Sequence, residues 1–376
     1  GGVLNTYERF AVPAFTPVFL NLCLIGVSLW LAPLFPAGSE VMALAWGVFI
    51  AGIVQLLFQF PFLAKLRLLR WPKYGFSHPG VKKIIRLMLP AIVGSAVVQI
   101  NLMIDLIIAY TLLPDSSVSW LTFSDRLVEF PLGVFGIAIA TVILPSLSQH
   151  HAKTDPAQFS RVMDWGIRWS LLIGLPSMVG LLLLAGPLLT TLFNYGAFTQ
   201  HDVLMSQMSL FAYAAGLLAF IWVKVLTPGF YSRQDTKTPV KIAVWAMFTN
   251  LVLNLAFVLP WLHYGLPGPH TGLAIATSIA AFLNAGLLFF SLKRQGVYKI
   301  EAGWGRLLRQ IFAALALMLA VLFVGVPELT VWFDWSYWQR GLMLGLWVSA
   351  GAVSFFAGLY IFGFRLGAFR AGMTTG

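Results

Sequence analysis

Apolar runs long enough to cross a membrane recur along this chain of 376 residues. A helix needs about 20 mostly apolar residues to span the hydrocarbon core of a bilayer. Charged residues make up only 10% of the chain and the mean hydropathy is +0.85, so a soluble domain is excluded. The alternating pattern of a membrane β-barrel, in segments of about ten residues, is absent. We therefore predict an all-α, polytopic membrane protein with about ten transmembrane helices, at 12–35, 41–64, 87–113, 118–148, 167–193, 203–230, 240–262, 271–292, 305–327 and 339–363.

Basic residues mark the loops that we expect to be cytoplasmic, because short cytoplasmic loops retain Lys and Arg. The loop 65–86 is rich in both and contains no acidic residue. Threading the spans alternately from that loop places all but two of the 24 basic residues on its side. The exceptions are Arg126, within a span, and Arg340, in an outer loop. The net charge of +11 thus indicates topology and contact with membrane lipids, not nucleic-acid binding. Both termini are predicted to be cytoplasmic.

Other classes of function lack their sequence signals. No G-x-x-x-x-G-K-[ST] phosphate loop is present, and the six histidines have no metal-ligand spacing. No nucleophile and base stand at catalytic spacing, so an enzyme is the least favoured class. The single cysteine, Cys23, lies in a span and is expected to pack as a small apolar side chain. We expect no cofactor other than a candidate sodium ion.

Three ionisable residues, Asp125, Arg126 and Glu129, interrupt the apolar span 118–148. Such groups are costly within a bilayer and mark functional sites. Helical spacing allows pairing among them, and Asp105 in the preceding span is expected at the same depth, about 12 Å from the outer end, facing Arg126. One interpretation is a self-neutralised structural cluster. However, these three acids against one arginine sum to −2, which favours a binding site, with Pro131 bending the helix just below.

A second polar group suits a monovalent cation. Asp105 supplies a carboxylate, and Asn250 and Asn254 share one face of a helix at i, i+4 spacing. Thr277 or Ser278 can add a hydroxyl from the next span. One carboxylate with several neutral oxygens fits sodium, whereas the alternative is hydrogen bonding that only joins helices.

The last two spans contain few polar groups, which suits a lipid-facing groove better than an aqueous path. Trp332, Trp335 and Trp338 lie in the loop that joins these spans. Indole rings favour the membrane interface, so this loop predicts an aromatic belt at the outer surface.

Four stretches resemble the lipid II flippases of the MurJ/MviN family, within the MOP exporter superfamily. They are "FSDRLVEFPLGVFGIAIATVILPSLSQ" (123–149), "VKVLTPGFYSRQDTKTPVKIA" (223–243), "MDWGIRW" (163–169) and "SSVSW" (116–120). The resemblance implies a MOP-type transporter with two six-helix lobes around a central cavity, followed by a two-helix extension. It implies that lipid II, an undecaprenyl-pyrophosphate-linked disaccharide pentapeptide, is flipped across the bacterial inner membrane by alternating access. The resemblance places Arg126 in the central cavity, so we predict that Arg126 binds the pyrophosphate. We also predict that Asp125 and Glu129 orient Arg126, and that Pro131 and Arg233 act in the conformational change.

The same resemblance divides the chain into family helices. Residues 1–64 would be the remnant of the first lobe, 65–86 a basic cytoplasmic loop, 87–293 the second lobe and 304–366 the C-terminal pair. The first four helices would be missing, which agrees with a Tyr-x-Arg motif repeated at Tyr7 and Tyr231. We expect the full-length parent to flip lipid II and this fragment alone not to.

Two other functions stay open at this point. One is a MOP-type exporter of another lipid-linked oligosaccharide or a drug, and the other is a non-transporting remnant. Besides lipid II and membrane lipids, cell-wall synthesis proteins are expected partners.

Overall fold

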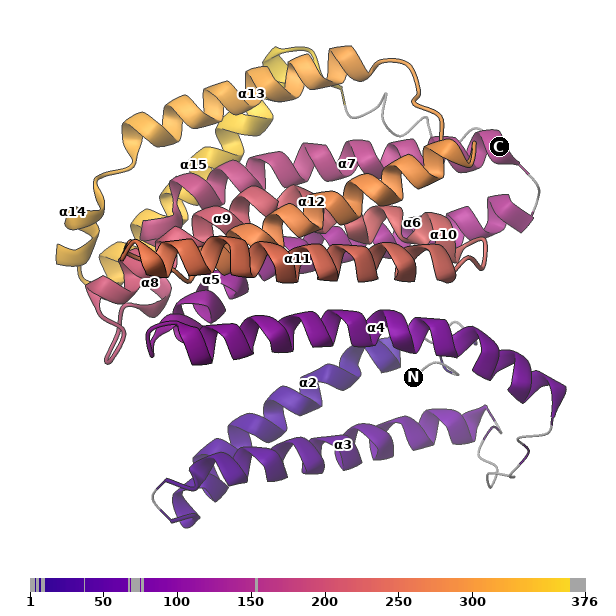
Figure 1. Cartoon of the computed structure of the whole chain (residues 1–376), viewed down its shortest axis with the longest axis horizontal. Helices are drawn as coiled ribbons and strands as arrows, with labels where there is room; N and C mark the ends of the chain where they lie inside the picture. The colour runs from indigo at the N-terminus through magenta and orange to yellow at the C-terminus, as the bar shows by residue number, and fades with distance from the viewer. Residues whose placement is uncertain are drawn as a thin grey trace. The chain divides into compact units, whose positions relative to one another are not determined.

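The fold is all-helical (Figure 1). The computed structural model describes residues 4, 7, 11–36, 38–66, 68, 75, 78–152 and 155–365, and every regular element in this part is a helix. Nine helices of the described residues are long and apolar enough to span a membrane. The predicted span 87–113 lies, except for its last residue, in a longer helix, Pro79–Leu112. The all-α membrane class is confirmed, and the chain divides into two compact units, Gly1–Val81 and Lys82–Gly376.

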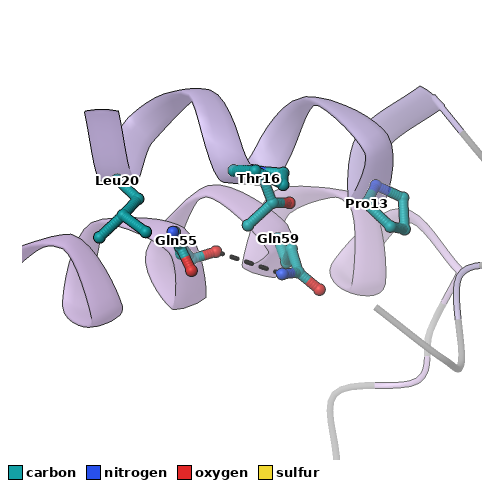
Figure 2. A pocket seen from close by; sticks show the side chains of 6 residues that line it. Pro13, Thr16, Leu20, Gln55 and Gln59 are labelled. Carbon is teal, nitrogen blue, oxygen red and sulfur yellow. Dashed lines mark hydrogen bonds between the residues drawn. The ribbon is translucent and has the colours of Figure 1, made fainter. Parts of the chain in front are cut away.

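The first unit contains a helical hairpin. It is built from α2 (Ala11–Gly26), the π-helix η1 (Val27–Leu31), the 3-10 turn η2 (Ala32–Leu34) and α3 (Glu40–Lys65). The rings of Phe15, Phe19 and Phe58 pack between the two helices at 4.7 to 6.1 Å. A hollow of about 420 Å³ opens on this hairpin (Figure 2), lined by Pro13, Thr16, Pro17, Leu20, Gln55 and Gln59. Much of the predicted basic loop, residues 67, 69–74, 76 and 77, lies outside the described residues.

The second unit is a bundle organised around α9. Its elements are α4 (Pro79–Leu112), α5 (Ser117–Pro131), η3 (Leu132–Gly136), α6 (Ile137–Ala152), α7 (Pro156–Leu183), α8 (Ala185–Phe193), α9 (Gln200–Leu226), α10 (Pro228–Tyr231), α11 (Lys237–His263) and α12 (Thr271–Arg294). Helix α9 contacts α5, α7 and α12 and supplies fully buried core residues, among them Leu210, Leu217 and Ile221. Because α5, α7 and α12 all pack on α9, the contacts with α9 determine which face of each of these helices is buried.

Two helices begin well before the apolar runs that predicted them. Helix α7 begins at Pro156 and not at 167, and α4 begins at Pro79 and not at 87. The Asp155 side chain accepts a hydrogen bond from the Gln158 backbone N–H (3.0 Å), and Pro156 follows at the first helical position. Hydropathy misses such turns because they are polar. The predicted loop 65–86 is therefore shorter, since residues 79–86 are helical.

The predicted span 118–148 is one long helical segment whose geometry changes after Pro131. A five-residue π-helix, Leu132–Gly136, follows the proline and separates α5 from α6. Proline has no N–H to donate to the preceding turn, and irregular turns are common where such a bond is missing. The departure from α-helical geometry lies where the sequence predicted a bend, and the role of Pro131 in transport stays a prediction.

The C-terminal helices belong to the same compact unit as the bundle. Helices α13 (Trp304–Gly325), α14 (Leu329–Asp334) and α15 (Tyr337–Ile361) follow α12, and α13 and α15 contact α7. The predicted aromatic belt is wrong for one of its members. Trp332 is fully buried, with its ring 4.9 Å from that of Trp335, because α14 folds back onto α8. Trp338 is 85% exposed, as an interfacial residue should be.

A close approach of α9 and α12 depends on a glycine. A Cβ on Gly216 of α9 would lie 2.7 Å from the Cβ of Ser278 and 3.0 Å from its Cα, on α12. The Ser278 hydroxyl donates to the Ala212 carbonyl at 2.7 Å across the same contact. The two backbones therefore pack with no room for a side chain.

We predict that Gly216→Ala destabilises the protein by about 1 to 3 kcal/mol, because overpacking forces the helices apart. The measurement is the melting temperature of the purified protein in detergent. Gly286→Ala on α12 is the matched control, since a Cβ there meets nothing within 4 Å. Equal melting temperatures for the two variants would contradict the prediction.

Candidate substrate and cation site

A closed polar cluster joins α4, α11 and α12. The Asn254 amide donates to the Asp105 carboxylate (2.6 Å) and to the Asn250 side-chain oxygen (2.9 Å). The Thr277 hydroxyl lies 3.1 Å from the Asn250 amide and 3.4 Å from Asp105. The structure thus brings together the four residues that the sequence predicted for a cation.

Asn101, one turn before Asp105 on α4, also belongs to this cluster. Its amide lies 3.5 Å from the Asp105 carboxylate. With the Asn250 amide turned over, its nitrogen donates to Asn101 and to Asp105, each at 3.1 Å, and its oxygen accepts from Thr277. Sequence analysis missed Asn101, although its i, i+4 spacing from Asp105 was a usable signal.

The chemistry of these side chains fits a small hard cation. Asn250 and Asn254 are buried, and the Asn254 side-chain oxygen has no hydrogen-bond partner among the described residues. Leaving a buried oxygen unpaired is costly, and an amide oxygen is a type of ligand that hard cations accept. Ser278, the alternative hydroxyl, instead bonds to α9. No group of three His, Cys, Asp or Glu side chains that could hold a metal ion gathers in the described residues.

The charged cluster lies on α5. Arg126 forms an ion pair with Glu129 at 2.9 Å, and the two side chains are 68% and 57% exposed. Asp125 lies within electrostatic range of both. The expected meeting of Arg126 and Asp105 is not seen in the described residues, because Asp105 is directed at α11 and α12. Internal pairing along one helix turn satisfies Arg126 instead.

Helix α5 is held so that this charged face points away from α9. On its opposite face the Ser124 hydroxyl lies 2.6 Å from the Ser206 carbonyl oxygen and 2.8 Å from the Ser209 hydroxyl. One turn earlier the Trp120 indole donates to Asp202 at 2.7 Å. These contacts fix the rotation of α5, so the exposure of the charged side chains is built into the bundle.

An imidazole completes the anchor at this end of α5. The His270 ring lies 4.9 Å from that of Trp120, and its Nε2 is 2.9 Å from the Met205 carbonyl oxygen. Burial lowers the pKa of His270, while the hydrogen bond to Met205 acts against this. The ring is therefore neutral near pH 7 and donates from Nε2.

One tyrosine connects the two clusters. Tyr213 of α9 is buried, and its hydroxyl lies within electrostatic range of both Asp105 and Asp125. A charge change at either carboxylate is therefore felt at the same ring.

Arg233, expected to act in the conformational change, joins α10 to the end of α12. Its guanidinium donates to the Gly229 carbonyl (3.0 Å) and to Gln295 (2.7 Å), and it lies 5.6 Å from the Phe230 ring. Desolvation lowers the pKa of Arg233, and Asp235 acts against this. These contacts make it an anchor in this structure, and its role in movement stays a prediction.

Known proteins resemble this chain in sequence and in fold. A sequence profile described as "Lipid II flippase MurJ" matches residues 1–342. This chain belongs to the MurJ family. The resemblance found in the sequence is confirmed, and with it the classification as a multi-pass membrane transporter and not an enzyme.

Relatives match almost the whole chain. A probable lipid II flippase MurJ of Vibrio cholerae is 47% identical over 97% of this chain and 68% of its own length. Its counterpart in Haemophilus influenzae is 42% identical over 97% of this chain and 71% of its own length. The lipid II flippase MurJ of Burkholderia cenocepacia is 39% identical over 98% of this chain and 70% of its own length.

A solved structure also matches. "Lipid II flippase MurJ, inward closed conformation" superposes with a TM-score of 0.71 over 96% of this chain and 69% of that one, at 24% identity, which supports the fold alone. These shares do not show which helices of the relatives lie outside the match. The expectation that the first four helices are missing is therefore not supported by the comparisons and stays a prediction.

We predict that sodium raises the melting temperature of the protein and that Asp105→Asn removes this effect. Binding to the folded state at 100 times the dissociation constant contributes about 2.7 kcal/mol. Melting curves in NaCl and KCl at equal ionic strength measure it. Thr111→Val is the matched control on α4, because its exposed hydroxyl bonds only to Ile107 of its own helix. Sodium-dependent stabilisation that survives in Asp105→Asn would show that the site is wrong.

Proposed function

We propose that the complete gene product flips lipid II across the bacterial inner membrane by alternating access. The observation that carries this proposal is the exposed Arg126–Glu129 pair within an apolar span of a MurJ-family chain. Exposed charges at this depth face a polar cavity and not lipid, because an unpaired charge in hydrocarbon is costly. Both termini of the chain are proposed to lie in the cytoplasm, and the distribution of its basic residues supports this orientation.

Arg126 is proposed to bind the pyrophosphate. A guanidinium has five N–H donors in a planar fork that matches two phosphate oxygens, and Glu129 engages only one of its nitrogens. Asp125 and Glu129 hold the fork in place when the cavity is empty. Release of substrate then restores the internal ion pair, so Arg126 has an anionic partner in either state.

The disaccharide-pentapeptide headgroup crosses in the cavity while the polyprenyl tail stays in lipid. Burying the charged headgroup in hydrocarbon without partners is prohibitive, whereas the tail is already soluble there. The apolar pair α13 and α15 suits a path for the tail, since their outer faces are apolar and exposed, as at Phe312, Phe323 and Phe356.

A sodium ion at Asp105 is proposed to bias the cycle. Asn101, Asn250, Asn254 and Thr277 would supply its neutral oxygens, and the ion would offset the Asp105 charge. Tyr213 lies near both Asp105 and Asp125, which gives an electrostatic link between ion and headgroup sites. The ion thus favours the state in which α4, α11 and α12 are drawn together.

We predict that Arg126→Lys and Arg126→Ala both abolish growth support in cells depleted of their own lipid II flippase. Losing the bidentate contact lowers substrate affinity by roughly tenfold to a hundredfold. Colony formation is measured with equal amounts of variant in the membrane. Arg161→Lys is the control, since Arg161 bonds to Gln158 of its own helix.

If the Arg126→Lys variant supports growth, the cluster of Asp125, Arg126 and Glu129 has a structural role and does not bind the pyrophosphate. Translocation of a cationic drug in place of lipid II would favour the wider exporter class. Residues 1–376 alone, expressed beside the complete gene, test the expectation that this chain does not suffice.

We also predict that deleting residues 304–376 from the complete protein leaves both lobes folded but impairs flipping. The tail then has no apolar path beside the cavity. Flipping is measured by the accessibility of labelled lipid II at the outer surface. Unchanged flipping in the deletion variant would refute the groove assignment.

A further inference from the structure

The C-terminal helices α13 and α15 contact each other and pack on α7 through an apolar middle. The Gln310 amide of α13 donates to the Phe362 carbonyl beyond α15 at 3.0 Å. Leu171 and Leu175 of α7 meet Ile311 and Leu315 of α13 in a shared core. Within a bilayer such contacts are only weakly favoured, because lipid tails cover the same surfaces equally well. Something else must hold the pair against the bundle.

At the end of the pair that follows α12, the holding group is Asp164 of α7. Its carboxylate is 3% exposed and accepts from the Tyr298 hydroxyl (2.7 Å) and the Trp304 indole (2.8 Å). Arg168, one turn later, neutralises it at 2.5 Å. Arg168 also donates to the Ala302 carbonyl at 2.8 Å and lies 5.2 Å from the Trp304 ring. One buried carboxylate thus binds the whole segment that leads into α13.

The same segment is held at a second point. The Ser160 hydroxyl, one turn before Asp164, accepts from the Lys299 N–H at 2.9 Å. Burial and the hydrogen bond to Asp164 raise the pKa of Tyr298 well above its usual value. The phenol therefore keeps its proton, and Asp164 keeps its donor, throughout the physiological pH range.

At the other end the holding group is Arg340 of α15. Its side chain is 6% exposed and donates to the Trp332 (3.0 Å) and Phe333 (2.9 Å) carbonyls of α14. It also reaches the end of α8, where the Asn194 side-chain oxygen lies at 3.3 Å and the Thr190 carbonyl at 3.4 Å. Arg340 was an outlier to the charge distribution, and its contacts explain why an arginine stands there.

We propose that Asp164 and Arg340 are positioning residues that clamp the C-terminal pair to α7 and α8 at its two ends. The pair and the bundle α4–α12 then move as one body during transport. This inference rests on the proposed function in one respect, namely that the lipid tail passes along α13 and α15. If these helices move with the second lobe, the groove for the tail keeps a constant width during transport. The movement that opens and closes the cavity must therefore occur elsewhere.

A covalent lock tests the clamp directly. A Cβ at Gly180 of α7 would lie 3.6 Å from the Met318 Cε of α13. Gly180→Cys with Met318→Cys, in a Cys23→Ala background of the complete protein, is joined by a short bifunctional methanethiosulfonate. We expect the locked protein to flip lipid II at the rate of the same protein after reduction. Flipping that stops on locking and returns on reduction would overturn the proposal, and so would failure of the two positions to cross-link.

Loosening each clamp gives the complementary test. Tyr298→Phe removes one donor from Asp164, and Arg340→Met removes all donors at the other end. We expect each variant to flip long-chain lipid II about tenfold more slowly, while a short-chain analogue that does not reach the pair is unaffected. Tyr360→Phe and Arg309→Met are matched controls, since Tyr360 is exposed and Arg309 bonds only within its own helix.

The outcomes separate the two proposals. Equal loss for both chain lengths would mean a purely structural role for Asp164 and Arg340 and would overturn the positioning role. Unchanged flipping of long-chain lipid II by both loosened variants would refute the dependence of the tail path on the clamps, whereas the lock would still decide whether the pair moves with the bundle. No flipping of either substrate by the unmodified protein would instead refute the proposed function.

Discussion

Inside hydrocarbon, a polar group without a partner costs roughly several kcal/mol, whereas apolar surfaces gain little by touching each other. The described structure follows this asymmetry closely. The apolar faces of its helices are interchangeable with lipid, so they do not decide which helices associate. The positions of a few polar side chains do. Asp105, Asp164 and Arg340 each draw together helices that are distant in sequence.

The same asymmetry separates structural charges from functional ones. Asp164 and Arg340 are buried and surrounded by partners, and each has one arrangement that satisfies it. Arg126 and Glu129 are exposed and bonded to each other. A side chain that must exchange partners during a transport cycle cannot be saturated and enclosed. The packing of Ser124 on α9 keeps this pair exposed. Exposure therefore distinguishes side chains that can bind substrate from side chains that hold helices together.

The cation cluster lies between these extremes. Its side chains are largely enclosed, yet the Asn254 oxygen has no partner among the described residues. Enclosure gives selectivity, and the unpaired oxygen leaves a position for an ion. Because Asp105 belongs to α4 and its partners to α11 and α12, an ion there would couple its own binding to the approach of these helices.

The apolar runs by themselves determined the all-α membrane class and the approximate spans, because crossing a bilayer imposes a minimum length on every helix. The polar residues within these runs also predicted that Asp105, Asn250, Asn254 and Thr277 would meet, because one carboxylate with several neutral oxygens suits a monovalent cation. Helix starts such as Pro156 could not be read from hydropathy, because they depend on a local capping bond. Only the tertiary structure decided which polar residues hold helices together and which stay exposed. The contact of Asp164 with Tyr298 joins residues 134 positions apart, and the burial of Trp332 depends on how α14 folds onto α8. These contacts depend on how whole helices rotate and pack against one another. The pattern of apolar residues along the sequence does not specify that packing.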